Sequence, residues 1–168
     1  MSDSSRTPVL TGGCQCGALR YALYVQPKEG VHLCHCRMCQ KAVGGPFAAL
    51  APVNLDDFAW TRGKPGTFAS SSVALRDFCP NCGTPLTFRY IDSGRTNVTI
   101  GSLDRPQDAP PEVHFGNEGR IGWLERIAGL PTETTEAHMA PDRKAKLVNH
   151  QHPDRETGDD WTPHPQGT

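Results

Sequence analysis

The spacing of the cysteines constrains this sequence more than any other feature. Its seven cysteines fall into three short groups, "GGCQCGALRY", "LCHCRMCQK" and "FCPNCGTPL". They are Cys14 and Cys16, then Cys34, Cys36 and Cys39, and finally Cys79 and Cys82. In a cytosolic chain, grouped cysteines indicate metal binding more often than disulfides. A redox or disulfide protein is the alternative, but cysteines in a CxC pair are poorly placed to bridge each other, and an odd cysteine would be left over.

Composition and charge indicate which kinds of binding partner are disfavoured. The net charge is -1 and the lysines and arginines form no block, which disfavours a nucleic acid or an anionic membrane surface. No apolar run approaches the roughly 18 residues that suggest a membrane-spanning helix. The first residues, "MSDSSRTPVLTGG", lack the apolar region of a secretory signal. We therefore expect a cytoplasmic protein that binds neither membrane nor nucleic acid.

Short alternating segments predict a mainly β fold. The 17 glycines and 15 prolines favour many short strands and turns over long helices. A turn or two of helix is expected over residues 37–43, ended by Gly44. The predicted strands and hairpins occupy residues 19–25, 31–36, 46–53, 66–78, 84–103 and 112–127.

A change in composition near residue 134 divides the chain. Residues 8–133 hold all the cysteines and predicted strands, and we expect one zinc-binding β domain there. Residues 134–168 are polar, with few apolar side chains, and we expect a flexible tail with a short helix over residues 142–149. Two histidines of this tail, His150 and His152, are expected at the surface.

The thiols suit zinc, which is borderline soft, redox-inert and tetrahedral in proteins. Cys14, Cys16, Cys79 and Cys82 can form a closed four-thiolate site, because "CPNCG" has the form of a zinc knuckle and "CQCG" is a tighter version of it. Such a site would join an N-terminal strand to a distant hairpin. We expect it to stabilise the fold directly.

The remaining cysteines, Cys34, Cys36 and Cys39, are one ligand short of a closed site. Three protein ligands and one open position are typical of a catalytic zinc site, where the open position binds water, hydroxide or a substrate thiolate. Two alternatives stay open at this point. The group could hold a second structural zinc with a fourth ligand from elsewhere, or it could hold metal loosely or not at all.

Four side chains deserve comparison with this three-cysteine group. His32, His35 and His114 are the candidates for a fourth ligand. His35 fits least, because a side chain between two ligands on a strand points the opposite way. Lys41 lies two residues after Cys39 and could place a positive charge beside the open position, although most lysines are simply solvated.

The three cysteine motifs, in this order, resemble the signature motifs of the glutathione-dependent formaldehyde-activating enzyme family. The resemblance covers about residues 8–133, where "VHFGNEGRIGWLERIAGLPTE" is similar to the segment that ends such domains, and it does not cover the tail. It implies a β-tent (Mss4-like) fold of short antiparallel strands with two zinc ions. The CxCG and CxxCG cysteines would bind the structural zinc and the CHCxxC cysteines the catalytic zinc, which is the partition that ligand counting suggests.

The resemblance also implies an activity, the condensation of formaldehyde with glutathione to S-(hydroxymethyl)glutathione, which is a carbon–sulfur lyase reaction in reverse. The partners would be a glutathione-like thiol and a small carbonyl compound. Zinc lowers the pKa of a coordinated thiol, and Lys41 or a zinc-bound water could donate the proton of the new hydroxyl. The cations available for the carboxylates of glutathione are Arg37, Arg62, Arg76 and Arg89.

Two other functions compete with a lyase. A non-catalytic, zinc-stabilised binding or sensing module would fill the fourth position of the three-cysteine site with a protein residue, whereas a lyase needs an exchangeable ligand there. A nucleic-acid-binding zinc ribbon would need a basic face, which the charge distribution disfavours.

Overall fold

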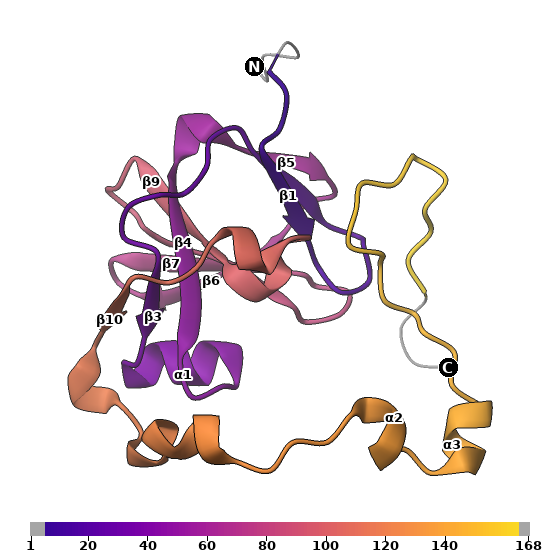
Figure 1. The fold of residues 1–168 in the computed structure, drawn as a ribbon. Helices are drawn as coiled ribbons and strands as arrows, with labels where there is room; N and C mark the ends of the chain where they lie inside the picture. Colours follow the sequence, from indigo (N-terminus) through magenta and orange to yellow (C-terminus); the bar gives the residue numbers. More distant parts are fainter. Residues whose placement is uncertain (1–5, 165–168) are drawn as a thin grey trace.

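Two β-sheets form the body of the protein in the computed structural model, which describes residues 6–164 (Figure 1). The smaller sheet has the strand order β1–β2–β5, and the larger has the order β10–β3–β4–β9–β8–β7–β6. Among the paired strands of this described part, only β10 and β3 run parallel. The mainly β, antiparallel architecture predicted from the sequence is therefore confirmed.

Most strands lie where the alternating segments predict them, but β1 and β5 fall outside the predicted segments. Their bounds are β1 (Leu10–Gly13), β2 (Arg20–Leu23), β3 (His32–Cys34), β4 (Ala48–Asn54), β5 (Phe58–Arg62), β6 (Gly66–Ser71), β7 (Ala74–Phe78), β8 (Pro85–Tyr90), β9 (Arg95–Thr99) and β10 (Val113–Phe115). Both predicted hairpins form, β6 with β7 and β8 with β9.

Helices are short and few in the described residues. α1 (Arg37–Val43) has the predicted bounds and ends at Gly44, whose φ of 64° lies in the left-handed region that glycine favours. Two further helices, α2 (Thr135–His138) and α3 (Pro141–Ala145), lie in the C-terminal segment. The 3-10 helices are Leu55–Asp57, Ile100–Ser102, Pro106–Asp108, Asn117–Gly119 and Gly122–Gly129. None of the helices within residues 6–164 has both the length and the apolar character needed to cross a membrane.

Both sheets contribute to the main hydrophobic core. Tyr21 of β2 is fully buried, and its ring centroid lies 5.5 Å from that of Phe58 and 6.0 Å from that of Trp60 on the neighbouring strand β5. Its hydroxyl forms a 2.7 Å hydrogen bond with the Ser102 hydroxyl, so the one polar atom of this ring has a partner. The apolar side chains that complete the core include Leu10, Leu19, Leu23, Val31, Val53, Leu86, Val98, Ile100 and Leu103.

An ion pair is buried beside the smaller sheet. The guanidinium of Arg20, on β2, donates hydrogen bonds of 2.8 and 2.5 Å to the two carboxylate oxygens of Asp104. The side chains of Arg20 and Asp104 are only 2% and 9% exposed, and Thr11 donates a further hydrogen bond to Asp104. All four residues of β2 are buried, although the alternation of side chains along a strand predicts burial of one face only. The ion pair with Asp104 allows the charged Arg20 to be buried as well.

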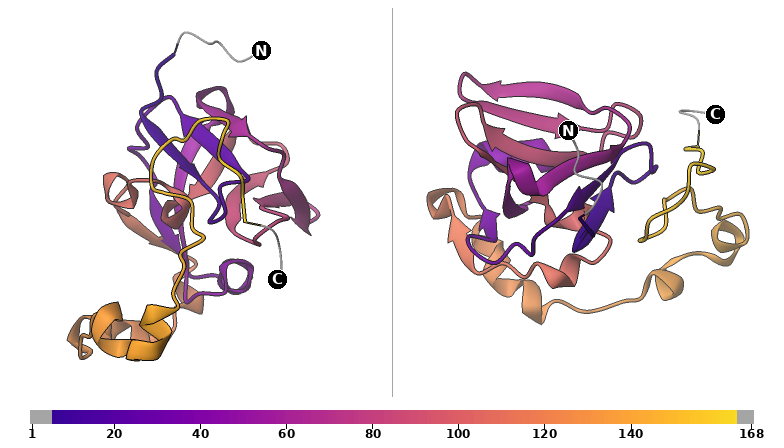
Figure 2. Two further views of the ribbon diagram at one scale, coloured as in Figure 1. Left: turned by 90° about the vertical axis from the view of Figure 1, so that its right-hand side faces the viewer. Right: turned by 90° about the horizontal axis from the view of Figure 1, so that it is seen from above.

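The C-terminal segment returns to the smaller sheet (Figures 1 and 2). Glu156 accepts a 2.7 Å hydrogen bond from Arg20, and the carbonyl of Thr157 accepts one of 2.8 Å from Arg62 on β5. His152 is only 4% exposed, so the expectation that it lies at the surface is wrong. The polar composition of this segment predicts a flexible tail. Composition contains no information about contacts with arginines about a hundred positions away in the sequence.

The Arg20–Asp104 pair generates a prediction about acid stability. Burial raises the pKa of Asp104, but the hydrogen bonds and charge of Arg20 outweigh burial and lower it below its ordinary 3.8. The pair therefore stabilises the fold above about pH 4, and this contribution is lost as the pH falls through the lowered pKa. We expect Asp104→Asn to reduce the free energy of unfolding at neutral pH by about 3 kcal/mol, because the buried Arg20 loses its buried partner and keeps only the 48% exposed Glu156.

Urea unfolding at several pH values measures this effect. The matched control is Asp108→Asn, which breaks an ion pair with Arg105 whose side chains are 61% and 38% exposed, and which we expect to cost less than about 1 kcal/mol. Equal losses in the two variants, or an unchanged acid dependence in Asp104→Asn, would contradict the prediction.

Candidate metal centres

The first cysteine group joins the two sheets. Cys14 and Cys16 lie in the connection between β1 and β2, whereas Cys79 and Cys82 lie between β7 and β8 of the larger sheet. All four sulfur atoms lie within 4.8 Å of one another. The Cys14–Cys16 and Cys16–Cys79 sulfur separations are 3.5 and 3.9 Å. A tetrahedral zinc with Zn–S bonds of about 2.3 Å separates its sulfurs by about 3.8 Å, so the donor set and its spacing fit zinc.

Backbone turns hold these thiols in place. The backbone N–H of Leu19 donates to the Cys14 sulfur at 3.2 Å, and the Asn81 side-chain amide donates to Cys16 at 3.2 Å. In the second turn, Gly83 has a φ of 77° and donates its N–H to the carbonyl of Cys79. A side chain at this positive φ would be strained, which explains why glycine follows the CxxC pair.

The surroundings shift the pKa of three of these thiols, in different directions. Burial raises the pKa of Cys14 and of Cys79. Burial also raises the pKa of Cys82, but hydrogen bonds with the side chain and backbone of Thr84 outweigh it and lower the pKa to about 6. Cys82 therefore gives the thiolate that metal binding requires more readily than Cys14 or Cys79.

The C-terminal segment covers this centre. The indole N–H of Trp161 donates to the Cys16 carbonyl at 2.9 Å, and the backbone N–H of His152 donates to the Gln15 carbonyl at 2.7 Å. At Gly17, with a φ of 75°, an added Cβ would lie 2.3 Å from His152 and 2.4 Å from Trp161. The segment therefore packs directly on the CQCG turn.

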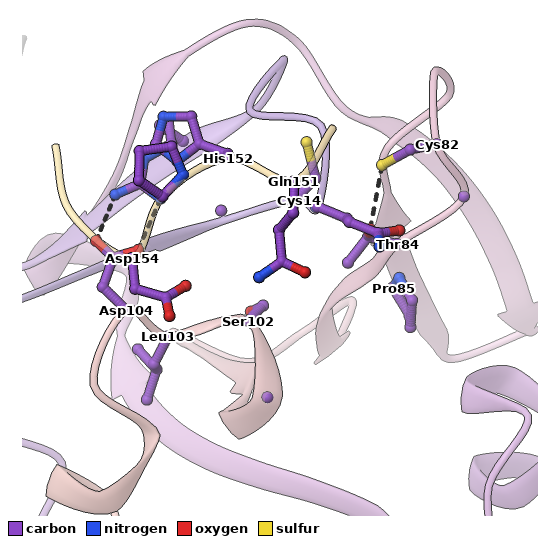
Figure 3. A pocket seen from close by; sticks show the side chains of 16 residues that line it. Cys14, Cys82, Thr84, Pro85, Ser102, Leu103, Asp104, Gln151, His152 and Asp154 are labelled. Carbon is purple, nitrogen blue, oxygen red and sulfur yellow. Dashed lines mark hydrogen bonds and ion pairs between the residues drawn. The ribbon is translucent and has the colours of Figure 1, made fainter. Parts of the chain in front are cut away.

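A cavity of about 400 Å³ lies between this centre and the C-terminal segment (Figure 3). Figure 3 shows Cys82 at one side of the cavity and His152, Asp104 and Asp154 at the other. Arg20, which pairs with Asp104, also lines it. Arg20 therefore contacts three parts of this region: it lines the cavity, it pairs with Asp104, and it donates a hydrogen bond to Glu156 of the C-terminal segment.

The second cysteine group lies nearer the opposite edge of the larger sheet, where β3 ends. Cys34 ends β3, Cys36 caps the N-terminus of α1, and Cys39 lies in the first turn of that helix. Their sulfur atoms lie within 4.8 Å of one another, and the Cys34–Cys36 separation is 3.5 Å. Within residues 6–164, no ligand atom of another Cys, His, Asp or Glu lies within 4.8 Å of all three sulfurs. This group could hold a metal ion with one position left for another ligand.

The three candidate histidines are placed outside this group. The side chain of His35, only 1% exposed, points away from the sulfurs and forms a 2.8 Å hydrogen bond from Nε2 to Nδ1 of His114. His32 instead forms a 2.7 Å hydrogen bond with the Gly30 carbonyl. The alternation of side chains along a strand, which disfavours His35 as a ligand, therefore holds in the structure.

The segment after β10 closes one side of the three-cysteine group. An added Cβ at Gly116 would lie 2.8 Å from the backbone nitrogen of Cys36, and one at Gly119 would lie 2.6 Å from the His35 carbonyl. The side-chain amide of Gln40 donates to both the His35 and Gly119 carbonyls, at 2.8 and 2.9 Å. Small residues therefore let this segment pack against the cysteine loop.

The thiols of this second group also differ in pKa. Burial raises the pKa of Cys34 to about 12. Burial acts in the same direction on Cys36, but hydrogen bonds from the backbone N–H of Cys39 and from neighbouring thiols outweigh it and lower the pKa of Cys36. Cys36 is held as the N-cap of α1, where a negative charge is favoured.

Arg76 of β7 is the arginine that reaches the three-cysteine group, a choice that the sequence leaves open. Its Nη2 donates to the Cys39 sulfur at 3.3 Å. The other three candidate arginines have different partners: Arg37 bonds Gln40, Arg62 bonds the C-terminal segment, and Arg89 lies 3.8 Å from Asp77. Lys41 is exposed on α1 and, together with Arg76, lines a cavity of about 500 Å³.

The covering of the four-cysteine centre yields a prediction about metal retention. Trp161→Phe removes the hydrogen bond to the Cys16 carbonyl, and we expect it to release the metal of this centre to a chelator several-fold faster. Trp123→Phe is the matched control, because Trp123 is 48% exposed and lies outside the centre. The rate of zinc release to a colorimetric chelator measures the effect. Equal rates in both variants and in the unsubstituted protein would show that the C-terminal segment does not protect the metal.

Two known proteins resemble this chain in sequence over most of their length. A Schizosaccharomyces pombe protein named as an uncharacterized lyase is 37% identical over 133 residues, covering 71% of this chain and 95% of that protein. A Halomonas elongata protein, provisionally named a glutathione-dependent formaldehyde-activating enzyme, is 27% identical over 146 residues, covering 75% of this chain and 91% of the relative.

A solved structure shares the fold. The crystal structure of a Rhodobacter sphaeroides protein superposes with a TM-score of 0.52 at 23% identity, covering 62% of this chain and 98% of that one. The sequence pattern characteristic of one enzyme family matches residues 9–118, which span both cysteine groups and most of the strands. The chain therefore belongs to the glutathione-dependent formaldehyde-activating enzyme family.

Proposed function

We propose that the protein is a zinc-dependent carbon–sulfur lyase that acts on a small thiol adduct, with glutathione and formaldehyde giving S-(hydroxymethyl)glutathione as the reference reaction. The observation that carries the proposal is the three-cysteine group, whose sulfurs lie within 4.8 Å of one another without a fourth Cys, His, Asp or Glu ligand in the described residues. An exchangeable position is what a lyase needs and a purely structural site does not. The names of the relatives support the same reaction class.

In this proposal Cys34, Cys36 and Cys39 hold the catalytic zinc. When bound, zinc lowers the pKa of a coordinated thiol and polarises a neighbouring carbonyl. The N–H of Arg76 at the Cys39 sulfur offsets part of the negative charge of the three thiolates. The packing of Gly116 and Gly119 on the cysteine loop keeps the ligands in position and excludes water from that side.

The proposed reaction balances without an oxidant or reductant. A bond forms between the thiol sulfur and the carbonyl carbon, the thiol gives up its proton, and the carbonyl oxygen receives one and becomes a hydroxyl. Lys41 extends from the same helix as Cys39, and we assign it the role of proton donor to that oxygen. Cleavage of the adduct follows the same path in reverse.

Cys14, Cys16, Cys79 and Cys82 hold a structural zinc in this account. Their sulfurs use all four tetrahedral positions, and they connect the two sheets. The seven cysteines are unpaired as thiols, which suits a reducing compartment, so we propose that the protein works in the cytoplasm.

A pair of cysteine variants tests the proposal. We expect Cys36→Ser to reduce the glutathione–formaldehyde exchange rate to the uncatalysed level while leaving the far-ultraviolet circular dichroism spectrum unchanged, because one of the three ligands of the open site is lost. We expect Cys82→Ser to unfold or aggregate the protein, since the closed site stabilises the fold. Two-dimensional exchange NMR with carbon-13 formaldehyde measures the rate.

The two variants also distinguish the alternatives. Global unfolding of Cys36→Ser would assign a structural role to the three-cysteine site and favour a zinc-stabilised binding module. A stable and active Cys82→Ser protein would contradict the division into four and three ligands.

A further inference from the structure

An apolar cavity of about 500 Å³ lies against α1 and the face of β6, β7 and β8. A cavity of this volume is in the range that holds metabolite-sized ligands. Two apolar residues that line it remain well exposed, Met38 at 53% and Phe68 at 61%, although covering such surface is favourable. Its apolar lining is formed by Met38, Val43, Leu50, Phe68, Phe78 and Phe88.

Arg76 connects this cavity to the three-cysteine group. Its guanidinium lines the cavity, its Nη2 donates to the Cys39 sulfur at 3.3 Å, and its Nε donates to the Ser70 hydroxyl at 3.0 Å. The guanidinium carbon lies 4.7 Å from the centroid of the Phe88 ring. These contacts fix a cation between the sulfurs and the apolar wall. A ligand in the cavity therefore lies next to the site where we place the reaction.

Formaldehyde leaves this cavity unused. The molecule is scarcely larger than water, whose share of liquid volume is about 30 Å³, and it has no apolar group to cover the exposed rings. Glutathione fits the lining no better, because it carries two carboxylates and an ammonium, and buried charges require partners. Lys41 and Arg76 are the two cations among the lining residues, and none of the lining residues is an acid that could pair with the ammonium of glutathione.

We propose that the cavity holds the substituent of the carbonyl partner, and that this partner is an aldehyde with an aryl or medium-length alkyl group. The inference rests on the proposed function, because it assigns a substrate class to the same site. The thiol sulfur bonds to the aldehyde carbon and the thiol proton ends on the aldehyde oxygen. Nη1 of Arg76 makes no hydrogen bond to the described residues, so it is available to donate one to that oxygen.

Two stable analogues of the adduct test the inference by binding alone. S-benzylglutathione carries an aryl group on sulfur and S-methylglutathione carries only a methyl group, while the glutathione part is the same. We expect the zinc-loaded protein to bind S-benzylglutathione at least tenfold more tightly by calorimetry, because even one methylene in an apolar pocket is worth about tenfold or more. Exchange NMR with glutathione and either benzaldehyde or formaldehyde, the aldehydes whose adducts these two analogues mimic, gives the matching rates.

A matched pair of variants locates the effect. Ala42 lines the cavity from α1, and Ala42→Leu fills part of it. Ala69, which is exposed between Phe68 and Ser70 on β6 and does not line the cavity, accepts the same substitution as a control. We expect the preference for S-benzylglutathione to fall at least tenfold in Ala42→Leu and to persist in Ala69→Leu. If Ala42→Leu does not fold, the affinities of the unsubstituted protein for S-benzylglutathione and S-methylglutathione still test the inference, because that comparison requires no variant.

The outcomes separate this inference from the proposed function. Equal affinity for the two analogues, or an equal loss of both in Ala42→Leu, would overturn the inference, and the second result would place the glutathione part in the cavity. Formaldehyde turnover without any preference for the benzyl group would leave the proposed function intact and the inference wrong. A benzyl preference without turnover of either aldehyde would support the cavity assignment and refute the lyase.

Discussion

The connection between the two sheets depends on four sulfur atoms. Cys14 and Cys16 follow β1 of the smaller sheet, and Cys79 and Cys82 follow β7 of the larger one, so a metal bound by these thiols ties the two sheets together. Short strands alone bury limited apolar surface, and structural zinc sites contribute directly to folding free energy. The contacts of Trp161 and His152 on the same turn are consistent with a centre whose protection matters to the whole fold.

The second group differs from the first in what surrounds it. Segments of β3, α1 and the chain after β10 enclose its three sulfurs on one side, where Gly116 and Gly119 pack closely. On the other side, Arg76 contacts Cys39 and also lines an apolar cavity. One fold thus offers a group of four thiols that can close a metal site and a group of three thiols next to a cavity. This asymmetry, rather than the number of cysteines, is the basis of the proposed lyase.

Local sequence patterns predicted the features that depend on neighbouring residues. The bounds of α1 agree with the structure, because an N-terminal cap and a C-terminal glycine define a short helix locally. The alternation of side chains along a strand, which is also a local property, ranked His35 as the weakest of the candidate histidine ligands. The division of the cysteines into one group of four and one group of three could also be predicted, since each cysteine motif has its own ligand spacing.

Local sequence patterns could not predict contacts between segments that are distant in the sequence. The sequence offered four arginines for the site, and only the pairing of β7 with its neighbours brings Arg76 to Cys39. His152 looked like a surface residue because its own segment is polar, and its burial depends on the CQCG turn more than a hundred positions earlier. No local periodicity encodes either contact, although the unusual "DDWTPH" at the end of a polar stretch holds an aromatic residue that could have signalled packing.

The most direct test of this account is the number of zinc ions that remain bound to each chain. Elemental analysis of reduced protein, purified without added metal or chelator, measures it. The account predicts close to two zincs per chain, one in the closed four-thiolate site and one in the three-thiolate site. A value close to one, unchanged after zinc is added back and excess metal is removed, would contradict a second metal site and with it the proposed catalytic centre.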